Sequence, residues 1–299
     1  MQFEILKDQL HTDGVVNIKG LLDSKDVDLI DLAISKNLKS PSPFGKNVMT
    51  DSSDGSFFID YNNWQRIPEI YAGCTLPAIL NTIRSLTSSR ECWLFHDTVL
   101  VKSGAATATP WHQDQPYFIF KGDLNLSVWI PTSPVPRNSS SLLFWRGSHK
   151  SSLTYVPKDF ANGKPIKGKN KFLNLQETQI PQEEIINFEM DRGDFLVFFH
   201  TTAHASKPHV DNSIRKSLSI RFLLDGASLT KNYNNATPPF DRMGVDVQED
   251  GSIPSRLNSI LNGSSSPVPG SFVSCRASKS TVRSKLTPSE RSKPTFNEY

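Results

Sequence analysis

The segment Arg215–Phe222 alternates between two kinds of side chain, and this alternation restricts the fold more than any other feature of the chain. Polar or charged residues occupy every second position and mostly apolar ones lie between them: Arg215, Ser217, Ser219 and Arg221 against Lys216, Leu218, Ile220 and Phe222. Successive side chains of a β-strand point to opposite faces. The alternation therefore predicts a strand with one core-facing apolar face and one polar face.

Other short segments from Cys92 onward also read as strands. Each is bounded by Gly, Pro, Asp or Ser, as strands separated by turns commonly are. We expect strands over Phe95–Lys102, Leu124–Pro131, Ser141–Trp145, Phe195–His200 and Lys216–Leu224. Many short strands after a helical front end predict a mainly β fold with flanking helices (α+β) and a double-sheet, jelly-roll core.

The N-terminal part reads as a strand followed by helices. Gly14–Leu22 is short and rich in β-branched residues, which favours a strand. Asp23 and Ser24 can accept hydrogen bonds from the free amides of a helix start, and apolar residues then recur at helical spacing until Lys39–Pro43. A second helix is predicted over Leu76–Ser88.

The chain is predicted to contain one large domain with a tail. The domain covers residues 1–262 and includes an insert over about 157–190, whose first part, Lys158–Lys171, holds five lysines. We expect this insert to be a long loop or lid. Residues 263–299 are rich in Ser, Lys and Arg and poor in large apolar residues, so we expect a flexible tail there.

Composition and charge exclude several classes of protein. Hydrophobic residues make up 37% of the chain and aromatic residues 10%, so a disordered protein is not expected. Apolar stretches are far shorter than the ~20 residues that cross a bilayer, so no membrane partner is expected. The three cysteines lack CxxC spacing, which indicates reduced thiols and a cytoplasmic location.

The net charge of +3 belongs to the tail rather than to the domain. Beyond Gly263 the chain holds six basic and two acidic residues, which more than accounts for the surplus. The domain itself therefore has no excess of positive charge with which to attract nucleic acid, and no nucleic-acid partner is expected.

The stretch Trp111–Tyr117 contains the most informative short motif, His112-Gln113-Asp114. If it lies on or beside a strand, His112 and Asp114 project to the same face. An imidazole and a carboxylate converging in this way are two-thirds of the 2-His-1-carboxylate triad that holds Fe(II) and leaves positions open. On its own, the motif is equally consistent with a chance tripeptide.

The third ligand has to be a distant histidine. The candidates are His11, His96, His149, His200, His204 and His209. His200 and His204 follow the apolar strand Phe195–Phe199, and a histidine at such a strand end is more often a structural residue than a ligand. Arg215 strengthens the ligand reading, because a guanidinium can hold the distal carboxylate of 2-oxoglutarate by two hydrogen bonds, although a solvated strand end is its commoner role.

Taken together, these segments resemble the phytanoyl-CoA dioxygenase family of Fe(II)/2-oxoglutarate-dependent oxygenases. The resemblance covers roughly residues 10–240 and is carried by Pro110–Phe118, Leu124–Pro131, Ser141–Lys150, Gly193–Ser206 and Arg215–Phe222. It implies a double-stranded β-helix core of the jelly-roll, cupin-like type. The cofactors that it implies are Fe(II), 2-oxoglutarate as co-substrate, and O2.

The resemblance also assigns residues. His112, Asp114 and His204 match the metal ligands, with His204 rather than His200 as the third. Ser206 and Arg215 match the residues that hold 2-oxoglutarate, although the chain has His204-Ala205-Ser206 where the family usually has His-Gly-Ser. Trp129 and Lys102 fall near two further co-substrate positions, and core packing fits Trp129 equally well. The weaker candidates for substrate contact are Gln115, Tyr117 and Arg221.

The implied activity is oxidation of an unactivated C–H bond of a small metabolite, with release of succinate and CO2. Because Asp114 occupies the position where related halogenases have a small residue, hydroxylation, desaturation or oxidative cyclisation is expected. We favour specialised or amino-acid-derived metabolism and a small-molecule substrate that could bear a carboxylate. Two alternatives stay open, an acyl-CoA hydroxylase of lipid catabolism and a cupin-like metal protein that is not an oxygenase.

Overall fold

The computed structural model describes residues 2–48, 55–157, 175, 178–210 and 212–230. All of these lie in one unit, Met1–Ser266. The expected tail, 263–299, and most of the lysine-rich insert lie outside the described residues. The end of the expected insert is described, and it contains a core strand, Ile185–Asn187.

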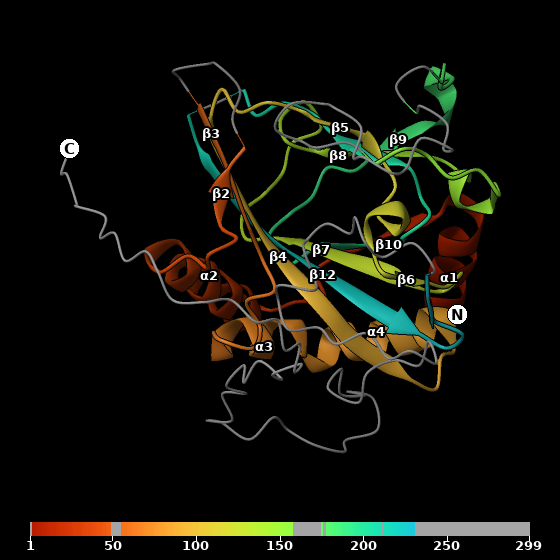
Figure 1. Ribbon diagram of the computed structural model, residues 1–299, viewed down its shortest axis with the longest axis horizontal. Helices are drawn as coiled ribbons and strands as arrows, with labels where there is room; N and C mark the ends of the chain where they lie inside the picture. The colour runs from red at the N-terminus through yellow and green to blue at the C-terminus, as the bar shows by residue number, and fades with distance from the viewer. Residues whose placement is uncertain (1, 49–54, 158–174, 176–177, 211, 231–299) are drawn as a thin grey trace, which may run out of the picture. The chain divides into compact units, whose positions relative to one another are not determined.

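Two antiparallel sheets form the core, as the jelly-roll prediction requires (Figure 1). The larger sheet has seven strands in the order β1-β10-β7-β12-β4-β3-β2. Their bounds are β1 Val15–Ile18, β2 Lys46–Asn47, β3 Gly55–Tyr61, β4 Cys92–Gly104, β7 Leu126–Pro131, β10 Phe195–Phe199 and β12 Ile214–Leu224. Its long central pairing joins β12 to β4 from Ile214–Ser103 to Leu224–Cys92, with one irregularity between Arg221 and Phe222.

The smaller sheet has four strands in the order β5-β11-β8-β9. They are β5 Thr109–His112, β8 Leu142–Trp145, β9 Ile185–Asn187 and β11 His204–Ser206. A separate two-stranded pair consists of β6 Phe120–Lys121 and β13 Ser228–Leu229. Short 3-10 turns, η1 Gln115–Tyr117, η2 Ser148–Lys150 and η4 Gln182–Glu184, connect these strands.

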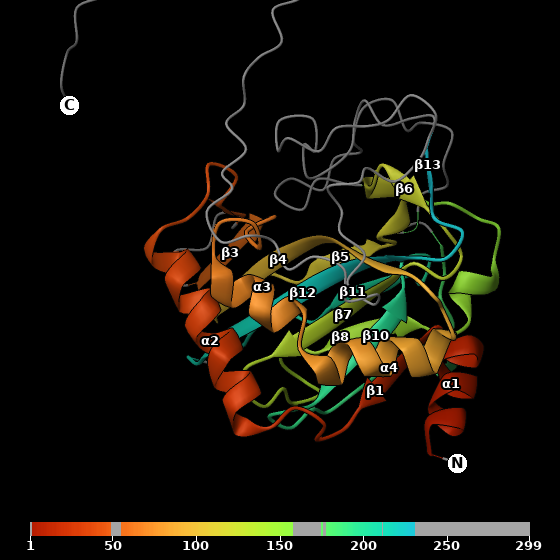
Figure 2. The same cartoon turned by 90° about the horizontal axis from the view of Figure 1, so that it is seen from below.

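Helices cover the face of the larger sheet that lies away from the smaller one (Figure 2). They are α1 Gln2–Asp13, α2 Ser24–Lys39, α3 Pro68–Cys74 and α4 Pro77–Thr87. The start of α2 is the expected one, since the Asp23 carboxylate accepts the Asp26 amide at 2.9 Å and Asp26 completes the capping box. In the described part of the chain, no helix combines the length and apolarity that a membrane crossing needs.

Strand β12 has one face toward the helices and the other toward the smaller sheet. Its apolar residues Leu218, Ile220 and Phe222 pack with those of the helices in the largest apolar cluster. The alternate residues are buried as well, because they face the second sheet rather than water. Arg215 and Arg221 are 4% and 9% exposed, and Ser217 and Ser219 are fully or almost fully buried. The polar face predicted from the alternation therefore lines the interior of the jelly roll.

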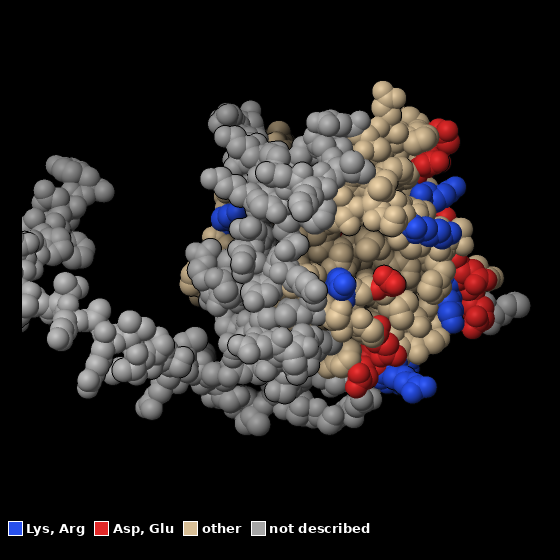
Figure 3. Space-filling model, turned by 45° about the vertical axis from the view of Figure 1, so that its right-hand side comes forward, with Lys and Arg blue, Asp and Glu red and all other residues tan. Residues whose placement is uncertain are grey.

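The surface, by contrast, mixes charges of both signs. In the view of Figure 3, acidic and basic side chains are interspersed over the described face, and they do not gather into one basic area there. The interior between the sheets also holds charged residues, among them Arg215 and Arg221.

Candidate metal centre

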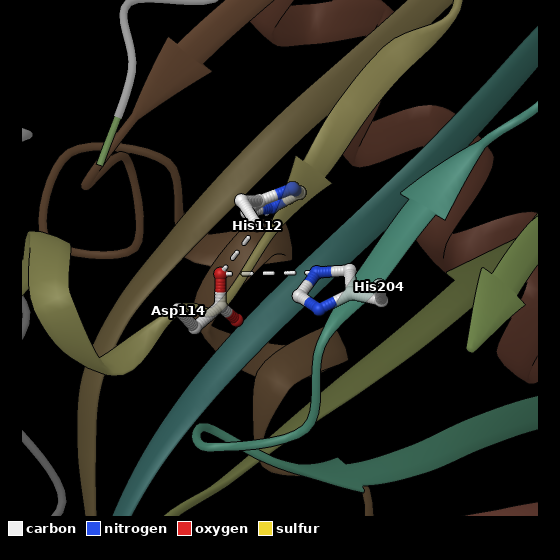
Figure 4. Close-up of side chains that lie close together, drawn as sticks. All are labelled: His112, Asp114 and His204. Carbon is white, nitrogen blue, oxygen red and sulfur yellow. Dashed lines mark ion pairs between the residues drawn. The ribbon is translucent and has the colours of Figure 1, made fainter. Parts of the chain in front are cut away.

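Three side chains meet at the edge of the smaller sheet (Figure 4). His112 ends β5 and His204 begins β11, and the two are direct partners in the antiparallel pairing of these strands. Asp114 follows β5 at the start of η1. Its Oδ1 atom lies 3.9 Å from His112 Nε2 and 4.0 Å from His204 Nε2. One ligand atom from each residue lies within 4.8 Å of the others, which is the spacing of a single-ion site.

Backbone carbonyls orient both imidazoles. His112 Nδ1 lies 2.9 Å from the Pro110 carbonyl, and His204 Nδ1 lies 3.0 Å from the Thr202 carbonyl. A carbonyl can only accept, so each Nδ1 carries the hydrogen and each Nε2 keeps its lone pair. Both Nε2 atoms face Asp114. This is the tautomer that a histidine needs in order to bind a metal through Nε2.

The protonation states suit a divalent cation. Burial lowers the pKa of His112 to about 3 and also lowers the pKa of His204, so both rings are neutral near pH 7. Burial alone would raise the pKa of Asp114, but the Arg221 guanidinium and the two imidazoles outweigh it and hold that pKa well below its usual range. Two neutral nitrogens and one carboxylate form the donor set of a non-haem Fe(II) centre.

The second oxygen of Asp114 is already engaged. Ser127 Oγ donates to Asp114 Oδ2 at 2.6 Å, and Arg221 Nε lies 3.3 Å from the same atom. Arg221 therefore contacts the carboxylate of the triad. The two opposite charges are buried side by side, and the weaker expectation that Arg221 contacts substrate stays a prediction.

The other histidine candidates lie outside this group. His200 is fully buried directly after the end of β10. Its ring packs edge-to-face against Phe118, with the ring centroids 5.1 Å apart. His209 bonds to Ser140 and to the Ser213 carbonyl. Of the seven histidines, the three-residue metal group contains only the two that the family resemblance selected.

A second cluster lies at the other end of the inner face of β12. Arg215 pairs in register with Lys102 of β4, and both are buried. Lys102 Nζ donates to Ser206 Oγ at 2.9 Å and to the Thr107 carbonyl at 2.7 Å, and it lies 4.6 Å from the centre of the Phe57 ring. Ser206 is two residues beyond His204, so β11 contributes to both clusters.

The two basic groups lack an anionic partner within the described chain. None of the ion pairs between described residues includes Arg215 or Lys102, and Arg215 Nε makes no hydrogen bond there. Burial lowers the pKa of Arg215 to about 10, and burial together with the charge of Arg215 lowers the pKa of Lys102 to about 6. Buried basic groups with free donors are suited to binding a carboxylate from outside.

Trp129 lies beside this cluster. Its ring is 5.3 Å from the Arg215 guanidinium carbon, and it belongs to the apolar cluster between the sheets. Its indole Nε1 is buried and has no hydrogen-bond partner among the described residues. Trp129 therefore packs in the core, as one of the two readings expected, and its co-substrate role stays a prediction.

The weaker candidates divide. Tyr117 is buried and its ring packs edge-to-face against His112, with centroids 5.9 Å apart, so it borders the metal centre. Gln115 uses its side-chain amide to bond the Phe120 carbonyl, which ties the local turn together. Sequence reasoning missed Ser127, although a lone hydroxyl in the apolar strand Leu126–Pro131 is a usable signal for a functional contact.

The two clusters fit the expected cofactors. The triad has the donors and the spacing for Fe(II), and the Arg215–Lys102–Ser206 cluster offers buried basic groups and a hydroxyl of the kind that suit a carboxylate. Strand β11 of the smaller sheet and strand β12 of the larger sheet each contribute residues to this interior region between the sheets.

Solved structures with the same fold include two enzymes from nogalamycin biosynthesis. The epimerase SnoN, in complex with Fe3+, alpha ketoglutarate and nogalamycin RO, is 19% identical, with a TM-score of 0.61 over 84% of this chain and 92% of SnoN. The alpha ketoglutarate dependent carbocyclase SnoK from nogalamycin biosynthesis is 16% identical, with a TM-score of 0.63 over 80% of this chain and 89% of SnoK. At these identities the similarity establishes a shared fold.

Sequence relatives define the family. Peroxisomal phytanoyl-CoA dioxygenase of Homo sapiens is 26% identical over 223 residues, which are 70% of this chain and 64% of the relative. The chain thus matches less than two-thirds of that relative's length. The family model described as Phytanoyl-CoA dioxygenase (PhyH) matches residues 10–217, which is well over half of the chain. With its triad and jelly-roll core in place, this chain belongs to the phytanoyl-CoA dioxygenase family.

Proposed function

We propose that the protein is an Fe(II)/2-oxoglutarate-dependent dioxygenase that oxidises an unactivated C–H bond of a small metabolite. The observation that carries this proposal is the combination of a preformed metal triad with two buried basic groups that lack an anion within the described chain. A metal-binding protein without oxygenase activity would need the triad but would not need Arg215 and Lys102. Only a co-substrate with a distal carboxylate also requires Arg215 and Lys102.

His112, Asp114 and His204 would hold the iron. The carbonyls of Pro110 and Thr202 fix the two rings, so the ligands are oriented before the metal arrives. Bound iron and 2-oxoglutarate would supply the oxidising power from O2, with release of succinate and CO2. The protein's own part is to hold the ligands, keep water out and place the substrate carbon.

Arg215, Lys102 and Ser206 would hold the distal carboxylate of 2-oxoglutarate. Lys102 already donates to Ser206 Oγ, and Ser206 Oγ also accepts the Thr109 amide at 3.0 Å, so this hydroxyl is positioned in advance. Trp129 would pack beside the guanidinium and limit its movement. The positive charge of the cluster gives the co-substrate its orientation relative to the triad.

Asp114 limits the reaction type. A carboxylate in this position occupies the metal site that a halide needs, so the proposed reactions are hydroxylation, desaturation or oxidative cyclisation. A small specialised or amino-acid-derived metabolite is the proposed substrate class, and the similar fold of enzymes acting in nogalamycin biosynthesis is compatible with it. A reducing compartment is proposed because the described cysteines, Cys74 and Cys92, are free and buried.

An acyl-CoA hydroxylase is the second candidate, favoured by the 26% identity to human phytanoyl-CoA dioxygenase. A substrate panel separates the two candidates. Acyl-CoA thioesters and small specialised metabolites would be incubated with the enzyme, Fe(II) and 2-oxoglutarate, and substrate-dependent succinate would be measured. Stimulation by acyl-CoA alone would replace the first candidate with the second.

The oxygenase proposal itself has a direct test. Anaerobic addition of Fe(II) and 2-oxoglutarate should give the weak visible charge-transfer band of an iron–keto-acid chelate, and admission of O2 should bleach it as succinate forms. Zn(II) in place of Fe(II) is the control and should give neither signal. Absence of both the band and succinate with Fe(II) would exclude the proposed activity.

A further inference from the structure

Two neighbouring strands hold one and the same oxygen of the triad carboxylate. Ser127 of β7 and Arg221 of β12 are direct partners in the antiparallel register, and both point to the interior face. Ser127 Oγ lies 2.6 Å and Arg221 Nε 3.3 Å from Asp114 Oδ2. The other oxygen, Oδ1, is the one that faces the two imidazoles, at 3.9 and 4.0 Å.

The Arg221 head is itself held in place. Its Nη1 donates to Thr98 Oγ1 at 3.3 Å, across the pairing of β12 with β4. Asp114 therefore meets a guanidinium anchored on one side and a hydroxyl fixed by a central strand on the other. Neither partner depends on a long flexible loop, so the rotation of the carboxylate is restricted by the sheet.

We propose that Arg221 and Ser127 are positioning residues that reserve Asp114 Oδ2 and leave only Oδ1 for the metal. A carboxylate can bind a metal through one oxygen or two. A second metal–oxygen contact would occupy one of the positions that a three-ligand triad leaves open for the co-substrate and oxygen. The inference rests on the proposed function, and it identifies what keeps the centre open.

The proposal differs in its consequence from a purely structural ion pair. If Arg221 only stabilised the fold around Asp114, its loss would weaken metal binding and 2-oxoglutarate binding together. If the pair reserves Oδ2, its loss frees that oxygen for the metal. Metal binding is then largely kept, while 2-oxoglutarate competes with the carboxylate and binds more weakly.

The test compares two affinities in the same protein. Co(II) binding is measured by visible absorption, and 2-oxoglutarate binding to the Co(II)-loaded protein is measured by titration calorimetry. In Arg221→Met, the Kd for 2-oxoglutarate should rise about tenfold or more, the scale on which partners of metal ligands act. The Kd for Co(II) should change by a smaller factor. Arg221→Lys, which keeps the charge, should recover part of the loss.

Ser127→Ala is a second variant for the case that Arg221→Met does not fold. It removes only one hydroxyl group, so the fold should be kept. It should show the same split between the two affinities at smaller size. Lys216→Met is the matched control, because Lys216 lies on β12 but points to the helix side of the sheet, where it pairs with Asp31 of α2 at 3.1 Å. It should leave both affinities at their wild-type values.

The outcomes are distinct. A parallel loss of Co(II) and 2-oxoglutarate affinity in both variants overturns the inference, and so does an unchanged 2-oxoglutarate affinity. If the wild-type protein itself binds neither Co(II) nor 2-oxoglutarate, the proposed function fails and the inference fails with it. Selective loss of 2-oxoglutarate affinity, with the control unchanged, supports the assigned role.

Discussion

His200 and His204 are four residues apart, both are buried, and both follow the same apolar strand. Only His204 belongs to the triad. The difference lies in β11. His204 begins this strand opposite His112, whereas His200 precedes the turn and packs against Phe118. Strand pairing between distant segments decides which imidazole is placed to bind a metal, and local sequence does not encode that pairing.

His204→Ala should therefore abolish metal binding, because two ligands cannot replace the three-point site. His200→Ala is the matched variant, a buried histidine of the same segment, and it should retain one Co(II) per chain. Equilibrium dialysis against Co(II) measures both. Loss of the metal in His200→Ala with retention in His204→Ala would show that the third ligand is assigned to the wrong residue.

Lys102 predicts a proton linkage. Its pKa of about 6 is far below the ordinary lysine value, because of burial and the nearby Arg215, so at pH 7.5 the amine is mostly neutral in the free protein. A bound carboxylate favours the charged form and raises this pKa again. Binding of 2-oxoglutarate should therefore take up a proton, and its affinity should fall as the pH rises above about 6.

Titration calorimetry at pH 7.5 in two buffers of different ionisation enthalpy measures that proton. The wild-type protein loaded with Co(II) should show uptake, and Lys102→Met should show none. The lowered pKa of Lys102 also affects how the stability of the free protein depends on pH. The folded state binds fewer protons than the unfolded state above about pH 6, so stability rises with pH there through this group. Equal heats in the two buffers for the wild type would contradict the linkage.

At the scale of elements, the loop before α2 is locked to the start of β10 by a Gly-Asp pair. The Leu22 amide donates to the Gly193 carbonyl at 3.2 Å, and Asp194 accepts the Gly20 amide at 2.8 Å. Gly193 has a φ of +98°, and a Cβ there would lie 2.5 Å from the Leu22 carbonyl oxygen. Only glycine fits this close approach without movement of the backbone.

Gly193→Ala should lower the free energy of unfolding by about 1–3 kcal/mol, the cost of a strained backbone, with the clash adding to it. Urea unfolding followed by tryptophan fluorescence measures the loss. Gly226→Ala is the control for a positive φ alone, since Gly226 also has a positive φ but a Cβ there would meet no atom within 4 Å. An equal loss in the two variants would show that the contact with Leu22 contributes nothing.

Elements with a strong pattern were predictable from the sequence, and others were not. The helix Ser24–Lys39 has a cap and an apolar stripe, and the strand Ile214–Leu224 alternates over Arg215–Phe222, so both were expected nearly at their observed bounds. The elements that were not predicted include Gln2–Asp13, Gly55–Tyr61, Pro68–Cys74 and, inside the expected loop insert, Ile185–Asn187. They are short or weakly patterned, and they form because the packed sheet offers them a partner.

The sequence named the candidate site residues that lie in short motifs, but it did not reveal the contacts between the sheets. His112, Asp114, His204 and Arg215 lie in segments with family-specific spacing, so the resemblance named them as candidates, and the structure brings the first three together. The contacts of Arg221 and Ser127 with Asp114 cross from β12 and β7 to the turn after β5, and they depend on how the two sheets face each other. No short-range pattern in the sequence contains that information.

At the scale of the whole molecule, the Arg215–Lys102–Ser206 cluster should lower the stability of the protein until a carboxylate binds there. Arg215 is buried and has no ion pair within the described chain. Arg215→Met should therefore leave the unliganded protein at least as stable as the wild type, because it removes a desolvated charge. Addition of 2-oxoglutarate at 100 times its Kd, with Mn(II) present, should stabilise the wild type by about 2.7 kcal/mol.

The same addition should stabilise Arg215→Met far less at the same concentration, because the variant has lost its main anion-binding group. Urea unfolding with and without 2-oxoglutarate gives all four values. Mn(II) alone serves as the control and should stabilise both proteins similarly. A variant that is much less stable without ligand and gains as much from 2-oxoglutarate as the wild type would contradict this account of Arg215.

The buried polar face of β12 has a consequence for protein engineering. Methods that infer solvent exposure from the polarity of alternating residues would mark Arg215, Ser217, Ser219 and Arg221 as surface positions that are free to change. Libraries or solubility redesigns built on that assumption would place their substitutions between the two sheets. In this chain the positions open to such redesign are on the helices and outer loops, and the strand that looks most like a surface strand should be left intact.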